Sequence, residues 1–133
     1  MRDHTSLFAW QEARRVSQRV ILLAQTHWRP HLKAVYDQLQ RSALSVQLNI
    51  AEGYALSRPS LFCRHLRIAY GSAIETNELL EHLAEFLPNE RDEIEQIKAS
   101  SQRSQRLLLG LLHRETVQAV DVQELVIYPA INE

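Results

Sequence analysis

The sequence feature that most limits the fold is an apolar spacing of three or four residues, repeated along four long segments. In residues 6–26 the apolar positions follow steps of four, three, four, three and one: Ala9, Ala13, Val16, Val20, Leu23 and Ala24. Such spacing places side chains on one face of an α-helix. Residues 31–53, 60–86 and 89–114 repeat the pattern, and the whole chain has only three glycines and four prolines to interrupt it. The sequence therefore predicts an all-α protein.

Four long helices joined by short turns favour an antiparallel up-down-up-down four-helix bundle, which we assign to residues 1–114. Residues 115–133 differ, because they carry four acidic and no basic side chains and are rich in valine. We expect this acidic C-terminal tail to be extended or irregular. It is either an arm laid on the bundle or on a neighbour, or a short irregular helix with a loose end.

Small polar residues form a second stripe on the expected second helix. Four of them recur at steps of three, four and three residues: Ser42, Ser45, Asn49 and Glu52. A stripe of this kind, beside an apolar one, suits a hydrogen-bonded contact with another helix. Gly53 is expected to end the helix, because glycine readily adopts the left-handed conformation that closes a last helical turn.

Gly71 interrupts the third segment, and a glycine inside a helix costs about 1 kcal/mol relative to alanine. Close approach of another backbone is the expected compensation. Gly71 and Ser72 should then face the Ser45 and Asn49 stripe, either in the same chain or in another subunit. The full set assigned to helix packing or to a subunit interface is Ser45, Asn49, Glu52, Gly53, Gly71, Ser72 and Glu75.

Taken together, these sequence motifs resemble those of a known family. The pattern consists of Phe8, Trp10-Gln11-Ala13, Gln38-Leu39-Arg41-Ser42-Ala43, Ser45, Asn49-Ile50-Ala51-Glu52-Gly53, Phe62, Leu66, Ile68-Ala69, Gly71-Ser72 and Glu75. It is similar to the small proteins encoded within intervening sequences of bacterial 23S ribosomal RNA genes, and to the accessory variability determinant proteins of diversity-generating retroelements. The resemblance covers about residues 6–112 and implies a four-helix bundle that forms a homo-oligomeric ring, usually a pentamer, without known enzymatic activity. The acidic tail and a net charge of −1, rather than a strongly basic one, depart from that pattern.

Charge is unevenly distributed, although its sum is small. Ten basic and four acidic residues lie between Arg2 and Arg67, eight acidic and one basic between Glu75 and Glu95, and four basic and none acidic between Lys98 and Arg114. In an up-down bundle the basic stretches meet at one pole, whose arginines are candidates for binding RNA or DNA phosphates. The candidates are Arg14, Arg15, Arg58, Arg64, Arg67, Arg103, Arg106 and Arg114. The alternative is a solvated pole that complements helix dipoles.

Enzymatic chemistry finds no support in the sequence. No histidine follows a glutamate by three residues, as a di-iron bundle requires, and there is no phosphate-binding glycine loop or cofactor motif. We expect no enzyme activity, metal or cofactor. The single cysteine, Cys63, and the lack of an apolar span or secretion signal suggest a cytoplasmic protein. Candidate partners are further copies of the chain, RNA or DNA, and a nucleic-acid-processing protein. The second hypothesis is a protein-interaction scaffold that uses Leu79, Leu83, Phe86 and the tail.

Overall fold

The computed structural model describes residues 3–126, with side chains for residues 3–117, and confirms an all-α fold over them. The α-helices are α1 (Phe8–Thr26), α2 (Lys33–Ala55), α3 (Pro59–Phe86) and α4 (Arg91–Val126). A 3-10 turn precedes three of them: η1 (His4–Ser6) before α1, η2 (Pro30–Leu32) before α2 and η3 (Pro88–Glu90) before α4. Proline begins η2, η3 and α3, where its fixed φ angle suits a first turn and its missing N–H group is not needed.

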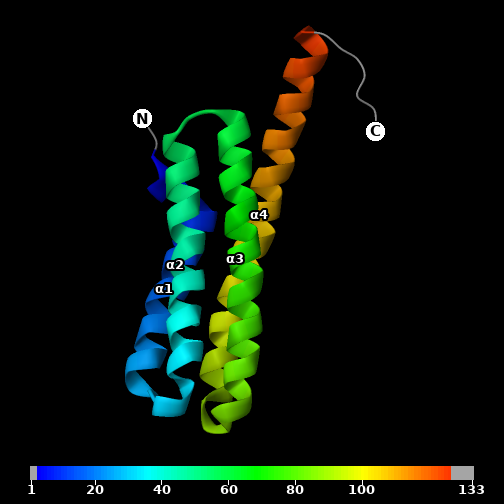
Figure 1. The fold of residues 1–133 in the computed structure, drawn as a ribbon. Coiled ribbons are helices and arrows are strands. Elements are labelled where there is room, and N and C mark those ends of the chain that lie inside the picture. Colours follow the sequence, from blue (N-terminus) through cyan, green and yellow to red (C-terminus); the bar gives the residue numbers. More distant parts are fainter. Residues whose placement is uncertain (1–2, 127–133) are drawn as a thin grey trace.

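Each helix packs against the next one in the sequence, and α1 also packs against α4. Figure 1 shows the α1–α2 and α3–α4 connections at one end of the molecule, which we call the acidic end. The N-terminal segment and the α2–α3 connection lie at the opposite end, which we call the basic end. Arg58 in the α2–α3 connection, and Arg106 and Arg114 of α4 beside the start of α1, are thereby brought to the same end, whereas Arg29 and Lys33 lie at the acidic end.

The core consists of two apolar clusters stacked along the bundle. The cluster toward the acidic end includes the fully buried Leu23, Leu39 and Leu80, and the other cluster includes Ile50 and Leu66. Complete burial of each such side chain stabilises the fold by about 1.5–3 kcal/mol. All four helices contribute to both clusters, so the apolar spacing of the sequence accounts for the packing.

Tyr36 is the one aromatic side chain that is fully buried in the cluster toward the acidic end. Its hydroxyl donates a 2.8 Å hydrogen bond to the carbonyl oxygen of His27, the residue after α1. Burial raises the pKa of Tyr36, so the phenol remains neutral and keeps this bond. The bond ties α2 to the end of α1 across their connection.

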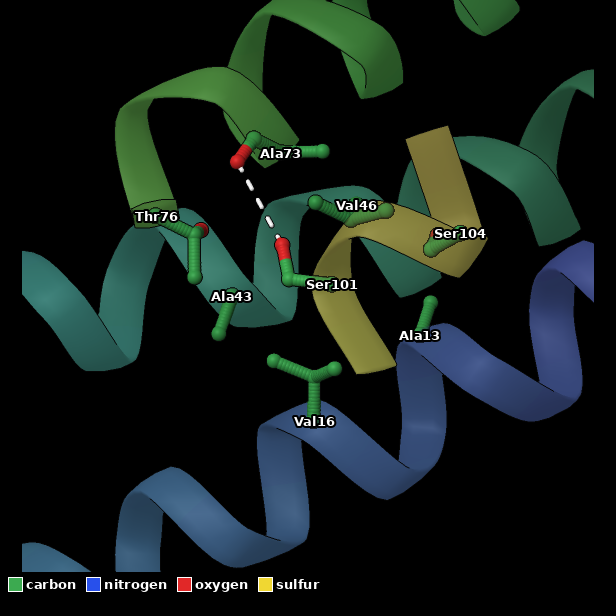
Figure 2. A pocket seen from close by; sticks show the side chains of 8 residues that line it. All are labelled: Ala13, Val16, Ala43, Val46, Ala73, Thr76, Ser101 and Ser104. Atoms are coloured by element: carbon green, nitrogen blue, oxygen red, sulfur yellow. Dashed lines mark hydrogen bonds between the residues drawn. The ribbon is translucent and has the colours of Figure 1, made fainter. Parts of the chain in front are cut away.

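Small side chains lie where the two clusters meet, at the middle of the bundle. Figure 2 shows the surroundings, where side chains from all four helices line a cavity of about 10 Å³: Ala13, Val16, Ala43, Val46, Ala73, Thr76, Ser101 and Ser104. The Ser101 hydroxyl donates to the carbonyl oxygen of Ala73 over 3.5 Å. Ser104 is equally buried, but its hydroxyl has no hydrogen-bond partner among the described residues.

Replacing Ser104 with alanine is therefore expected to raise the free energy of unfolding by about 1 kcal/mol, because a buried hydroxyl without a partner carries an uncompensated desolvation cost. Equilibrium unfolding in urea measures the change. Ser42→Ala is the matched control. Its hydroxyl is also buried but bonds Thr76 Oγ1 and the Leu39 carbonyl oxygen, so the same substitution should lower stability by about 1 kcal/mol. Equal effects of the two substitutions would contradict this interpretation.

The expected end of the second helix at Gly53 is wrong. Helix α2 continues through Gly53 to Ala55, and no glycine of the described chain has a positive φ angle. The left-handed residue is Ser57, with φ of 57°, in the connection to α3. Gly53 remains helical because its missing side chain serves close packing against α3, as described below.

The extended arm, one of the two alternatives for residues 115–133, is wrong for the part that the structure describes, and the helix found there is a continuation of α4 and not a short separate one. Helix α4 runs without a break to Val126, so residues 115–126 are helical and not extended, and residues 127–133 of the expected tail lie outside the described residues. No glycine or proline occurs between Gly110 and Pro129. Extending an existing helix requires no new nucleation, and this advantage outweighs the weak strand preference of valine.

Candidate helix seam and arginine surface

Four hydrogen-bonded pairs connect α2 and α3, and we call this set the α2–α3 seam. The pairs are Gln38 with Glu75, Ser42 with Thr76, Ser45 with Ser72, and Asn49 with His65. The oxygen atoms of the two hydroxyl pairs are 2.9 Å apart, as are Asn49 Oδ1 and His65 Nδ1. The predicted stripe of small polar residues on the second helix thus faces α3 of the same chain.

The Asn49 side chain makes three hydrogen bonds in the seam. Its amide nitrogen donates to the Ser45 carbonyl oxygen at 2.9 Å and to Ser45 Oγ at 3.1 Å. Its amide oxygen is therefore left to accept from His65, which must carry its proton on Nδ1. One side chain consequently joins a turn of α2 to a turn of α3.

Gly53 lies at the end of the seam and allows the two helices to approach closely. A Cβ atom at this position would lie 2.6 Å from His65 Cβ and 3.1 Å from Phe62 Cδ1. Gly71 is different, because it is exposed and a Cβ atom there would meet nothing within 4 Å. The close approach predicted at Gly71 is thus wrong within the described chain, and it occurs instead at Gly53.

The seam does not include every residue of the predicted motif. Glu52 and Gly71 are exposed and have no partner in it, whereas Glu75 takes part through Gln38. The sequence interpretation missed Gln38, His65 and Thr76. The last two lie seven residues before and four residues after Ser72, so helical spacing along the third segment was the signal that could have found them.

Exposed apolar side chains lie on the same two helices. Leu44 and Leu48 of α2 are 44% and 53% exposed, and Ile68 of α3 is 45% exposed. Leu44 precedes Ser45 and Leu48 precedes Asn49 in the sequence, so both are one position from seam residues. The second hypothesis needs a correction here, because Leu83 is fully buried and cannot supply outward contacts, whereas Phe86 is 47% exposed.

All eight candidate arginines are exposed, but the structure divides them into groups. Arg15 and Arg103 share Glu12: Arg15 Nη1 is 2.9 Å and Arg103 Nε is 3.4 Å from its Oε2 atom. Arg103 also donates to the Ser100 hydroxyl. The guanidinium carbon of Arg14 lies 5.8 Å from the Trp10 ring centre, within cation–π range. These three arginines are thus already engaged within the bundle.

The other five have no carboxylate within 4.0 Å among the described side chains: Arg58, Arg64, Arg67, Arg106 and Arg114. Arg106 and Arg114 line a groove of about 500 Å³ between the start of α1 and α4, which we call the α1–α4 groove. Arg58 immediately precedes α3 and lines a separate hollow of about 380 Å³ with Tyr54, Phe62 and Glu115 among its neighbours. Arg64 and Arg67 follow on α3.

The acidic end has a different character. Lys98 of α4 pairs with Glu81 of α3 and lies 3.7 Å from Glu95, and the Lys98 ammonium lowers the pKa of the Glu81 carboxyl group. His27 lies 3.4 Å from Glu90 and 3.6 Å from Glu93. No group of three His, Cys, Asp or Glu side chains suited to holding a metal occurs in the described part of the chain. None of the helices in that part has the length and apolar character needed to cross a membrane.

The fold and its site define an all-α protein of four packed helices, with a hydrogen-bonded seam between two of them. Toward one end it carries arginines that have no carboxylate within 4.0 Å among the described side chains. A family model described as "23S rRNA-intervening sequence protein" matches residues 5–110, and the chain belongs to this family. A search of the curated proteins finds no match. The family match ends inside α4, and the helix continues to Val126.

Proposed function

We propose that this protein is a non-enzymatic, homo-oligomeric binding protein, an antiparallel up-down-up-down bundle that holds nucleic acid through arginines at its basic end. The observation that supports this most is the set Arg58, Arg64 and Arg67. All three are exposed, lie within ten residues of one another, and have no carboxylate within 4.0 Å among the described side chains. A guanidinium group without a protein carboxylate is free to bind a phosphate with two donors. The proposed location is the cytoplasm, where ribosomal RNA is found.

The position of these arginines adds to the argument. Arg58 precedes the first turn of α3, and no side chain caps that helix. The unsatisfied N–H groups of a helix N-terminus carry partial positive charge, which favours a nearby phosphate. Arg64 and Arg67 extend the positive surface along α3. Phosphate contacts of this kind give affinity without sequence specificity.

Assembly into a homo-oligomer, a pentamer by family resemblance, would multiply these contacts. The exposed Leu44, Leu48 and Ile68 on α2 and α3 provide apolar surface for contacts between copies. A ring carries one arginine set per chain, and a polyanion that engages several sets at once is held more tightly than by any single one.

The test replaces all three arginines in Arg58→Gln/Arg64→Gln/Arg67→Gln and measures binding to a labelled single-stranded RNA by fluorescence anisotropy over a series of salt concentrations. The wild type should lose affinity steeply as salt increases, and the triple variant should reduce the log–log slope by about two units, since each single-strand phosphate contact contributes about 0.7. The oligomeric state should not change.

Arg29→Gln/Lys33→Gln/Arg91→Gln is the matched control. It also removes three positive charges, but from the acidic end. The ion pairs of Lys33 with Asp37 and of Arg91 with Glu95 are exposed, so their loss should cost little stability. Its RNA affinity should remain close to that of the wild type. Equal losses in both triple variants, or binding that does not depend on salt, would overturn the proposal. No RNA binding at all by an intact oligomer would favour the scaffold hypothesis, for which the exposed Phe86 is the first contact to substitute.

A further inference from the structure

The α1–α4 groove places an exposed aromatic side chain beside two arginines. Phe8, the first residue of α1, lines the groove and is 70% exposed, more than any other large apolar side chain of the described residues. Arg106 and Arg114 line it from α4 and have no carboxylate within 4.0 Å among those residues. A single exposed apolar side chain is ordinary on a protein surface. Its place beside two guanidinium groups indicates a ligand that is both anionic and aromatic.

Gly110 gives this groove room for a flat ligand. It stands four residues after Arg106 and four before Arg114, so the three positions follow one another along one face of α4. A Cβ atom at Gly110 would meet nothing within 4 Å, and glycine leaves that space empty. The two arginines are eight residues apart, about 12 Å along the helix. Leu107 and Leu111 line the stretch between them, so the groove is apolar inside and has a positive charge toward either end.

Single-stranded nucleic acid fits this arrangement. Its phosphates are anionic, and its unpaired bases expose flat faces that stack on aromatic side chains. Phosphates about 12 Å apart are separated by about three nucleotides of a stacked strand, since each nucleotide adds about 3.4 Å. The two arginines can thus hold phosphates of one short segment while a base of that segment lies on Phe8. A duplex keeps the faces of its bases inside the stack and offers only its phosphates to the same groove.

The groove also lies close to the arginines of the proposed function. Arg114 lines the groove, and the next residue of α4, Glu115, lines the hollow that contains Arg58. Consecutive residues of a helix point about 100° apart, so the groove and the hollow lie on neighbouring faces of α4. A strand bound beside Arg58 at the start of α3 can therefore pass α4 and enter the groove.

We propose that the α1–α4 groove is a binding site for single-stranded nucleic acid, in which Arg106 and Arg114 bind phosphates and Phe8 stacks on a base. This inference rests on the nucleic-acid binding of the proposed function. It adds the form of the ligand, because the arginine set at the start of α3 offers phosphate contacts that single and double strands share.

The test compares two probes by fluorescence anisotropy: a short labelled oligoadenylate RNA, and the same strand annealed to its complement. Phe8→Leu keeps an apolar side chain but removes the aromatic face, so it should weaken binding of the single strand about tenfold. Its affinity for the duplex should be unchanged. Phe8→Trp offers a larger aromatic face and should bind the single strand at least as tightly as the wild type.

Phe86→Leu is the matched control, because it makes the same change at an exposed phenylalanine of the acidic end, and it should leave both affinities unchanged. Arg106→Gln/Arg114→Gln should weaken binding of both probes. It should also reduce the log–log salt slope for the single strand by about 1.4 units, from about 0.7 for each phosphate contact. Equilibrium unfolding in urea establishes that each variant is folded.

The outcomes separate the groove from the proposed function. A wild type that binds neither probe overturns both. Equal losses for the two probes in Phe8→Leu, no loss in it, or no rescue by Phe8→Trp overturn the groove alone, as does wild-type affinity in Arg106→Gln/Arg114→Gln. A loss confined to the single strand and rescued by Phe8→Trp supports the groove. If the triple variant of the proposed function then retains its affinity, only the role of the α3 arginines is overturned.

Discussion

Replacing Gly53 with leucine is expected to lower the free energy of unfolding by about 3 kcal/mol. The first added atom alone would lie 2.6 Å from His65 Cβ, an atom fixed to the α3 backbone, so the two helices must separate to admit it. Overpacking of this kind costs about 1–3 kcal/mol and more when a whole side chain must be placed, and it outweighs the better helix propensity of leucine. Equilibrium unfolding in urea measures the change.

Gly71→Leu is the matched control, because Gly71 is also inside a helix but faces open space. Stability should increase by about 0.5–1 kcal/mol, the difference in helix propensity between leucine and glycine. A destabilised Gly71→Leu together with a tolerated Gly53→Leu would refute the assignment of the close approach to Gly53. A stable but dissociated Gly71→Leu would place that face of α3 at a contact between copies.

Replacing Asn49 with alanine is expected to lower the free energy of unfolding by about 2 kcal/mol. The substitution removes three hydrogen bonds at once and leaves the half-buried His65 Nδ1 without its acceptor. The loss should appear as a lower urea midpoint with an unchanged slope, because the compactness of both states is preserved.

Gln47→Ala provides the comparison for Asn49, since it shortens another half-buried amide side chain on α2 that makes no side-chain hydrogen bond within residues 3–117. Its effect should stay within about 0.5 kcal/mol. Asn49→Asp keeps the acceptor for His65 but loses both donors to Ser45, so its stability should lie between those of the wild type and the alanine variant. An Asn49→Ala protein as stable as Gln47→Ala would show that the seam does not depend on this residue.

The helices themselves could be predicted from the sequence, because burial of an apolar stripe depends only on spacing within each segment. That Ser45 lies on a polar stripe of its helix also followed from this spacing, and its contact with Ser72 was predicted because Ser72 is the small polar residue beside Gly71. The roles of the two glycines could not be predicted. Whether a missing Cβ matters depends on how near the facing helix comes, and that distance follows from the relative register of α2 and α3, which neither segment encodes alone.

The pairing of the eight candidate arginines also could not be predicted from the sequence. The count and approximate place of the arginines followed from the sequence, but which of them are already paired did not. Arg103 meets Glu12 across 91 residues of sequence, and this contact depends on how α1 and α4 are rotated against each other. Arg106 and Arg114 share a groove for the same reason. The end of α4 was misjudged because valine favours strands only when a partner strand exists, whereas the helix was already formed.

The hydroxyl and amide pairs between α2 and α3 also determine how far these helices can slide along each other. Two leucine-lined helices offer similar contacts after a shift of one turn, about 5.4 Å, since one aliphatic group replaces another. Here such a slip would break three hydrogen-bonded pairs at once: Ser42 with Thr76, Ser45 with Ser72, and Asn49 with His65. It would also move Gly53 away from His65, where the two helices are closest. The bundle therefore has a single permitted alignment, and any surface built from both helices is presented at one fixed height.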